Sequence, residues 1–180
     1  MSVRRSTEAN APALPGGRTV VLSAVLDQAR NPDEFAGVLG HGIRHVAARD
    51  STRARIRNSG LAFVLSYLTG DVTGSAIVVA LGPAVVSASH SREAERAADA
   101  HAVAALARVG GDATAVATIL ERIAAARGED PAFLRTHPFT RDRAAAIRSL
   151  VTAAAGARAP LLDAPSWAAL KAICGPVPAK

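Results

Sequence analysis

Two histidines stand four residues apart in the stretch VLGHGIRHVAARD, residues 38–50. If this stretch is helical, the side chains of His41 and His45 project from adjacent turns, about 40° apart around the axis. A catalytic zinc site takes three nitrogen or oxygen ligands from the protein and leaves a fourth position open. The pair could supply two of those ligands, although two polar residues at the edge of a core would show the same spacing.

A second helical stretch, SREAERAAD, offers the third ligand. Glu95 and Asp99 are also four residues apart, so they share one helix face. Glu95 can bind zinc, while Asp99 can accept a hydrogen bond from the other ring nitrogen of a ligand histidine and fix its tautomer. Taken alone, this stretch could instead be an exposed helix whose acidic and basic side chains pair with one another. His90 and His101 lie well around the helix from Glu95 and are interpreted as surface residues.

The histidine-bearing helix has a well-defined beginning in the sequence. Asn31 can cap it, and Pro32 fits the first helical position. The acidic pair Asp33-Glu34 suits the positive end of the helix dipole. We predict that the helix runs from there to about Ala48, which places both histidines on it.

The rest of the chain predicts more helix and one short strand. Only 3% of the residues are aromatic, and the apolar residues are mostly Ala, Val and Leu, which favours helix. RTVVLS at 18–23 is β-branched and short, as a strand would be. The expected helices cover 23–29, two segments flanking TGDVTG at 69–74, the second of which continues through 91–110, and then 112–127, 141–154 and 166–174. The prediction is a predominantly helical α+β fold.

The formal net charge is +6, and much of the arginine lies in RRS, RDSTRARIR and RTHPFTRDR. Nucleic acid or an anionic membrane surface could use such charge. No aromatic residues interleave the arginines as stacking platforms would. We therefore interpret the arginines as a solvated surface and expect no nucleic-acid partner. The single cysteine, Cys174, excludes an internal disulfide.

One stretch is apolar enough to raise the question of a membrane. Residues 61–87 are interrupted by Gly70-Asp71 and by Gly82-Pro83, which leaves runs closer in length to buried helices than to membrane spans. A buried helical hairpin is expected, with association at a membrane surface as the alternative. Residues 1–17 lack the apolar stretch of a secretory signal. We expect a cytoplasmic or membrane-associated protein whose residues 1–9 form a disordered tail.

Four blocks in order resemble one family: NAPALPGG before a strand, NPDEFAGVLGHGIRHV, SREAERAAD and FLRTHPFTRDR. They are similar to the zinc metallopeptidases of the HtpX and CAAX prenyl protease type, metallopeptidase family 48, from about Asn10 to Arg148. The resemblance implies a zincin-like domain over residues 10–155, short at its amino end and with a metal-bearing active-site helix. Residues 156–180 are then a C-terminal segment with one short helix.

The same resemblance implies a ligand set and a substrate. One zinc ion is expected on His41, His45 and Glu95, with a peptide or protein as substrate or client. Asp99 matches the aspartate that supports a ligand histidine in the family.

Three further positions match the family outside the ligand set. His137 matches a loop histidine near the metal, a candidate oxyanion stabiliser or fourth ligand, with a loop-anchoring role as the alternative. Arg143 matches the arginine that follows it, a second candidate oxyanion stabiliser. The strand around Val20 and Val21 is expected to line the cleft as the edge to which a substrate adds.

The chain departs from the family pattern at the residue that matters most for hydrolysis. The family motif is HExxH, usually with a small residue before the second histidine, but here Gly42 replaces the glutamate and Arg44 precedes His45. That glutamate is the general base, and a positioned proton shuttle is typically worth about 10²–10⁴ in rate. Gly42 therefore marks the position of a missing general base.

Three hypotheses follow. The first is a pseudopeptidase that binds zinc and has lost most or all hydrolysis. The second is a slow zinc endopeptidase in which zinc-bound hydroxide is assisted by His137. The third is a metal-free binding or membrane-associated module that keeps only the fold.

Overall fold

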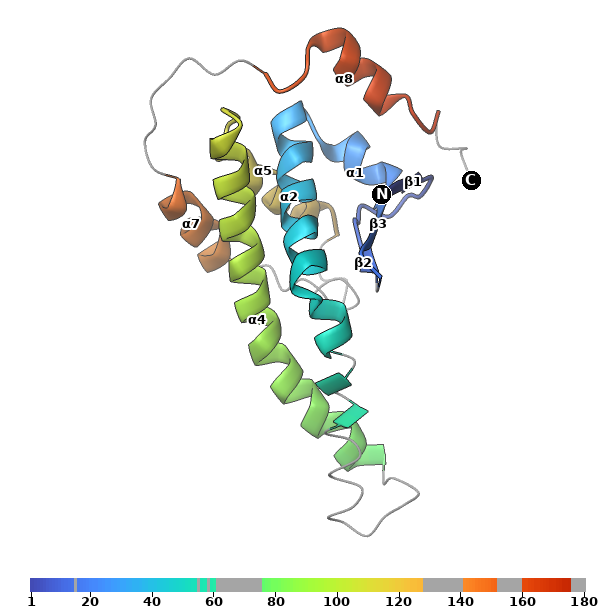
Figure 1. Ribbon diagram of the computed structural model, residues 1–180, viewed down its shortest axis with the longest axis vertical. Helices are drawn as coiled ribbons and strands as arrows, with labels where there is room; N and C mark the ends of the chain where they lie inside the picture. Colours follow the sequence, from blue (N-terminus) through green and yellow to red (C-terminus); the bar gives the residue numbers. More distant parts are fainter. Residues whose placement is uncertain are drawn as a thin grey trace.

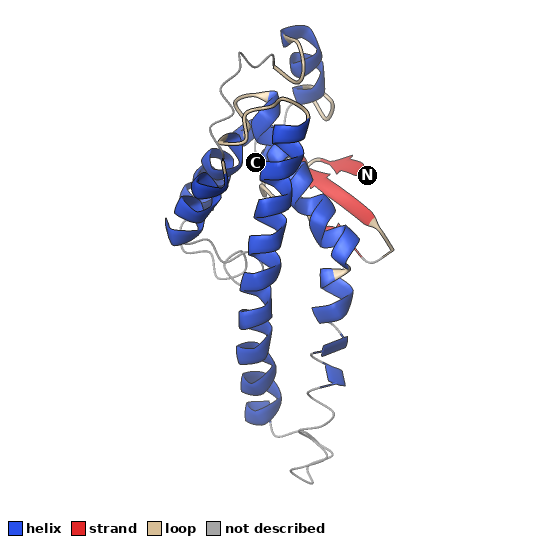
Figure 2. Cartoon of the chain, turned by 60° about the vertical axis from the view of Figure 1, so that its left-hand side comes forward, coloured by secondary structure: helices blue, strands red, loops and turns tan. Residues whose placement is uncertain are grey.

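The computed structural model describes residues 1–14, 16–54, 56–57, 59–60, 76–127, 141–151 and 160–175. Helices predominate, and one small sheet lies against them (Figures 1 and 2). This confirms the predicted α+β class. His137 and the first part of the predicted apolar hairpin, residues 61–75, lie outside the described residues.

The sheet has three strands in the order β1-β3-β2. β3 (Arg18–Leu22) pairs in parallel with β1 (Ser2–Arg4), with Ser2 opposite Val20, and antiparallel with β2 (Ala13–Leu14). The strand β1 lies within residues 1–9, where the sequence predicted a disordered tail. Three residues carry little local signal, and their pairing with β3 is a non-local contact that the sequence pattern does not reveal.

The turn between β2 and β3 depends on glycine. Gly16 and Gly17 have φ values of 83° and 77°, which glycine adopts without the steric penalty that a Cβ atom would bring. The predicted strand at 18–23 is confirmed as β3, one residue shorter, because the chain passes directly into α1 (Ser23–Gln28).

The helix α2 (Pro32–Ala48) confirms the predicted bounds. The Asn31 side chain accepts a hydrogen bond from the backbone N–H of Glu34 at 2.9 Å, and Pro32 stands in the first turn. The start of a helix leaves backbone N–H groups without partners. The Asn31 side chain satisfies one of them, and proline has no backbone N–H to satisfy. The helix ends at Arg49, which has a left-handed φ of 55°.

Four further labelled helices follow along the chain. They are α4 (Ala76–Arg108), α5 (Ala115–Arg127), α7 (Arg141–Leu150) and α8 (Ala164–Lys171). Two of them, α4 and α5, pack directly on α2. α4 runs beside α2, and the sheet lies on the opposite side of α2 (Figures 1 and 2). α8 begins two residues earlier than predicted because the Asp163 side chain caps it at Ser166 N. In the part of the chain that the structure describes, every helix is too short or too polar to cross a membrane.

Close packing against α4 and α5 fixes the position of α2, the helix that carries both histidines. A Cβ atom on Gly40 would lie 3.2 Å from the Cα of Ala102 in α4, and one on Gly37 would lie 3.2 Å from a methyl carbon of Val116 in α5. The absence of these side chains lets the helix backbones approach closely. Buried apolar residues on either side keep them there, among them Val25, Leu26, Phe35, Ile119, Val103, Leu106 and Ile147.

Candidate metal centre

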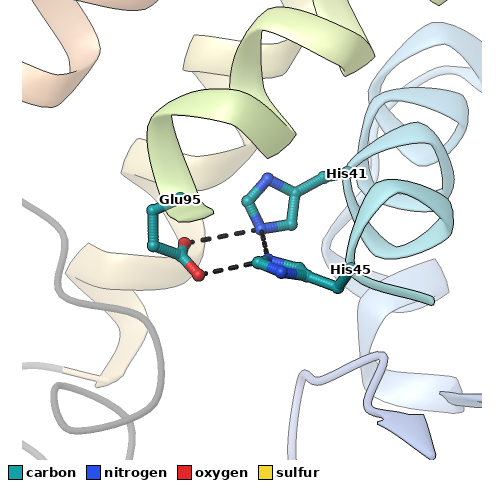
Figure 3. A group of neighbouring side chains, drawn as sticks. All are labelled: His41, His45 and Glu95. Carbon is teal, nitrogen blue, oxygen red and sulfur yellow. Dashed lines mark hydrogen bonds and ion pairs between the residues drawn. The ribbon is translucent and has the colours of Figure 1, made fainter. Parts of the chain in front are cut away.

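His41, His45 and Glu95 lie together between α2 and α4 (Figure 3). The Nε2 atoms of the two histidines are 3.0 Å apart. Glu95 Oε1 lies 3.1 Å from His45 Nε2, and its Oε2 lies 3.4 Å from His41 Nε2. Three ligands about 2.0–2.1 Å from one tetrahedral zinc ion would be about 3.3 Å apart. The spacing of these atoms therefore fits a tetrahedral zinc site with little movement.

One half of this centre is held by a buried network. His41 Nδ1 lies 3.0 Å from Asp99 Oδ1. Arg143 on α7 donates two hydrogen bonds to the Asp99 carboxylate, at 2.6 and 2.8 Å, and its Nη1 lies 2.7 Å from Glu95 Oε2. All four side chains are buried. The network joins α2, α4 and α7 at the level of the candidate ligands.

The charges of this network are set by its internal contacts. Burial alone would lower the pKa of His41, but hydrogen bonds with Asp99 and Glu95 raise that pKa above its ordinary value. Burial alone would raise the pKa of Asp99, yet hydrogen bonds from Arg143 and His41 lower it. The lowered pKa of Asp99 favours its ionised form, and this carboxylate is placed to accept a hydrogen bond from Nδ1–H of His41, with Nε2 facing the cluster.

The other half of the centre is local in sequence. His45 Nδ1 lies 2.9 Å from Asp50 Oδ2, five residues further along the chain. The Asp50 side chain is 24% exposed, compared with 3% for Asp99. Sequence reasoning missed Asp50 because residues five apart on a regular helix do not share a face. The only sequence signal is a carboxylate close to the end of the predicted helix.

Arg143, the second candidate oxyanion stabiliser, lies against two buried carboxylates in the structure. Its guanidinium is occupied by two carboxylates, Asp99 and Glu95, inside the protein. A group that stabilises an oxyanion must instead point donors toward the reacting carbonyl. The oxyanion role of Arg143 therefore stays a prediction, and its observed contacts are with Glu95 and Asp99.

Val20 and Val21 do not form an edge of the sheet. They belong to β3, which is paired with β1 on one side and β2 on the other. The backbone N–H of Val20 donates to Pro12 O at 3.1 Å, and Val21 is fully buried. Substrate addition at this strand stays a prediction, and β3 already has backbone groups engaged with β1 and β2 within the sheet.

Gly42 lies on the side of α2 that faces the sheet. A Cβ atom at this position would meet Ala11 O at 3.7 Å and the Thr19 methyl carbon at 4.0 Å. These are ordinary van der Waals distances, so packing tolerates the first atom of a side chain here. The general-base position thus lies beside the segment that leads into β2.

A helix-borne histidine pair completed by a glutamate from a second helix is a ligand set of catalytic zinc sites. The fold and the cluster together define a metallopeptidase-type domain. The chain belongs to peptidase family M48, whose model matches residues 1–151.

Two relatives named as proteases are similar to this chain over most of its length. The chain is 31% identical over 156 residues to the β-barrel assembly-enhancing protease of Escherichia coli O157:H7, a match that covers 79% of this chain and 32% of that protein. It is 30% identical over 148 residues to the mitochondrial metalloendopeptidase OMA1 of Schizosaccharomyces pombe, covering 79% of this chain and 44% of the relative. The chain thus spans less than half the length of these relatives.

Proposed function

We propose that this domain binds one zinc ion through His41, His45 and Glu95 and that its peptide hydrolysis is lost or severely reduced. The spacing of the three ligand atoms, which fits a tetrahedral ion, supports zinc binding. Gly42 at the general-base position of a metallopeptidase family supports the loss of hydrolysis. The domain is on this proposal a pseudopeptidase.

On this proposal, each residue of the centre has a separate role in binding the ion. When bound, zinc acts as a Lewis acid and lowers the pKa of a bound water toward about 7. Asp99 keeps the His41 proton on Nδ1, and Arg143 fixes the orientation of Glu95. Asp99, Glu95 and Asp50 each contact a histidine or arginine, so these three carboxylates are committed to the ligand set. A proton shuttle at position 42 is what the arrangement lacks.

We propose that a bound peptide adds to the sheet at the segment leading into β2 and not at β3. The backbone carbonyls of Asn10 and Pro12 accept hydrogen bonds from β3. Strand geometry alternates, so the backbone groups of Ala11 and Ala13 point away from β3. Ala11 O is also the atom nearest to a Cβ on Gly42. An extended segment of a peptide or protein client would pair there, beside the ligand cluster.

Several finer assignments remain proposals. The four sequence blocks alone support the HtpX and CAAX prenyl protease type within the family, and a cytoplasmic or membrane-associated location. We also propose residues 10–155 as the peptidase-like domain and 156–180 as a C-terminal segment. In that segment Trp167 of α8 packs on Phe35, with ring centroids 6.3 Å apart. Arg5 donates to Cys174 O, which ties the segment to the amino end.

The zinc stoichiometry of the purified chain, measured by elemental analysis, tests the proposal. We expect close to one zinc per chain and loss of zinc in His41→Ala. His101→Ala is the matched control, because it removes a histidine of α4 outside the cluster, and it should keep the metal. Casein incubated with the zinc-loaded chain should remain intact.

Two outcomes would change the conclusion. Casein cleavage that is abolished by a chelator and by His41→Ala would make the domain a slow endopeptidase. A folded chain that binds no zinc would support the third hypothesis, a metal-free binding module. Pelleting with anionic vesicles would then test whether that module binds membranes.

A further inference from the structure

The two candidate ligand histidines share an arrangement that the family resemblance does not assign to His45. Each presents Nε2 to the cluster, and each has a carboxylate oxygen at its Nδ1, at 3.0 Å for Asp99 on His41 and 2.9 Å for Asp50 on His45. Histidines that bind metals usually donate the second ring N–H to a carboxylate or carbonyl, which fixes tautomer and ring orientation. The cluster therefore has two such carboxylates.

The backbone explains how Asp50 reaches His45. On a continuous helix, five residues correspond to 500°, so Asp50 would point about 140° away from His45. The chain instead breaks at Arg49, whose left-handed φ of 55° ends α2. Helical structure resumes at once, since Arg53 N donates to Arg49 O at 2.9 Å. This break turns the Asp50 carboxylate back onto the imidazole.

The conformation of Arg49 has a cost. The left-handed region is disfavoured for residues other than glycine, because the Cβ atom comes too close to the backbone, and glycine is the usual residue at such helix ends. The turn at Arg49 brings the Asp50 carboxylate into contact with His45. A strained turn that places a carboxylate on a candidate ligand is better explained by the needs of the ligand than by helix termination alone.

We propose that Asp50 is a positioning residue for His45. Its carboxylate accepts a hydrogen bond from Nδ1–H of His45. This hydrogen bond keeps the Nε2 lone pair directed at Glu95 and His41. The inference rests on the proposed zinc site and extends it. Because Asp50 is partly exposed while Asp99 is buried, Asp50 acts on the ligand with little contribution to the packing of the helices.

Zinc affinity, measured by competition with a chromophoric chelator, tests the proposal. Asp50→Ala should weaken zinc binding by about 10–100-fold, the usual effect of removing such a partner. Asp50→Asn should recover most of the loss, because its amide oxygen still accepts the Nδ1 proton. Glu93→Ala is the matched control: it removes one exposed carboxylate near the cluster and should leave the affinity unchanged.

A second readout separates positioning from general stability. In ¹⁵N-histidine spectra of the zinc-loaded chain, His45 should carry its proton on Nδ1, with a proton shift typical of a carboxylate acceptor. Asp50→Asn should move that proton signal, whereas the corresponding signal of His41 should stay in place. Thermal unfolding of the zinc-free variants should match the parent chain.

The outcomes distinguish the two proposals. A parent chain without zinc overturns the zinc site and with it the role of Asp50. A parent chain that binds zinc, with Asp50→Ala and Asp50→Asn equal to it in affinity, overturns only the role of Asp50. Metal bound through Nδ1 of His45 would overturn that role as well, and it can be seen in the parent chain without any variant.

Discussion

The two sides of α2 that flank His41 meet different neighbours. On one side, Gly40 faces α4 so closely that a Cβ atom would lie 3.2 Å from the Cα of Ala102. On the other side, Gly42 faces the sheet, and a Cβ atom there would have only ordinary contacts, at 3.7 and 4.0 Å. Packing therefore requires glycine at position 40 and does not require it at position 42. On the proposed function, the missing side chain at Gly42 affects the chemistry, while packing does not exclude a side chain there.

The largest expected effect comes from restoring that side chain. Gly42→Glu in the zinc-loaded chain should raise peptidase activity by about 10²–10⁴, the typical value of a positioned general base. The rate of cleavage of a fluorogenic peptide measures it. Gly42→Gln is the matched control, because it has nearly the same shape without the base and should stay inactive. Equal rates for the two variants would show that another part of the machinery is missing.

The opposite side of the helix should respond to a side chain by losing stability. Gly40→Val should lower the free energy of unfolding by about 1–3 kcal/mol, since the added carbons meet backbone that cannot move away. Urea denaturation of the zinc-free chain measures this loss. Gly40→Ala combined with Ala102→Gly moves the methyl group to the facing helix and should be tolerated better than Gly40→Val. Full stability of Gly40→Val would refute the packing argument.

A methyl group at position 42 should instead be favourable. Gly42→Ala should stabilise the zinc-free chain by up to about 1 kcal/mol, because alanine has the higher helix propensity and meets no close contact. The same urea series measures it, so both glycines are compared under one condition. A loss of stability in Gly42→Ala would mean that the side facing the sheet is tighter than its distances indicate.

The smallest effect concerns an exposed ion pair between α5 and α7, outside the contacts of both glycines. Arg148 on α7 donates two hydrogen bonds of 2.7 Å to Glu121 on α5, and these lower the pKa of Glu121. A lowered pKa contributes stability above the unfolded-state value, about 4.3, and that contribution is lost as the pH falls through the folded-state value. Glu121→Gln should remove at most about 1 kcal/mol at pH 7 and nothing at low pH.

This pair also serves as a reference for the glycine comparison. Distant sites usually contribute independently to stability. Combining Glu121→Gln with Gly40→Val or with Gly42→Ala should therefore give additive changes in the free energy of unfolding. A non-additive result would show that the two sides of α2 are coupled through α5 and α7.

The sequence predicted those parts of the site that depend on local structure. The cap at Asn31 and the four-residue spacing of the histidines are both local, so the bounds of α2 and the shared face of its histidines followed directly. The pairing of His41 with a residue of a second helix was suggested by the spacing of Glu95 and Asp99.

The parts that sequence reasoning missed depend on long-range contacts or on an unusual turn. β1 is three residues long and forms only because β3 pairs with it. Asp50 reaches His45 through the left-handed Arg49, a conformation that an arginine does not signal. The family pattern suggested an oxyanion role for Arg143, but only the fold shows that two buried carboxylates already occupy its guanidinium.

The contact between Arg143 and the buried carboxylates has a consequence for the choice of ion. A cation that lies 2.7 Å from a candidate ligand would ordinarily repel a second positive charge. Here Glu95, Asp99 and Asp50 are three carboxylates and Arg143 is one guanidinium, so the formal charges of these four side chains sum to two negative charges. On the proposed zinc site, a divalent ion would balance that formal charge. Without Arg143 the formal charge would be three negative charges, so on the proposed zinc site the arginine brings the formal charge of the pocket to the value that a divalent ion balances.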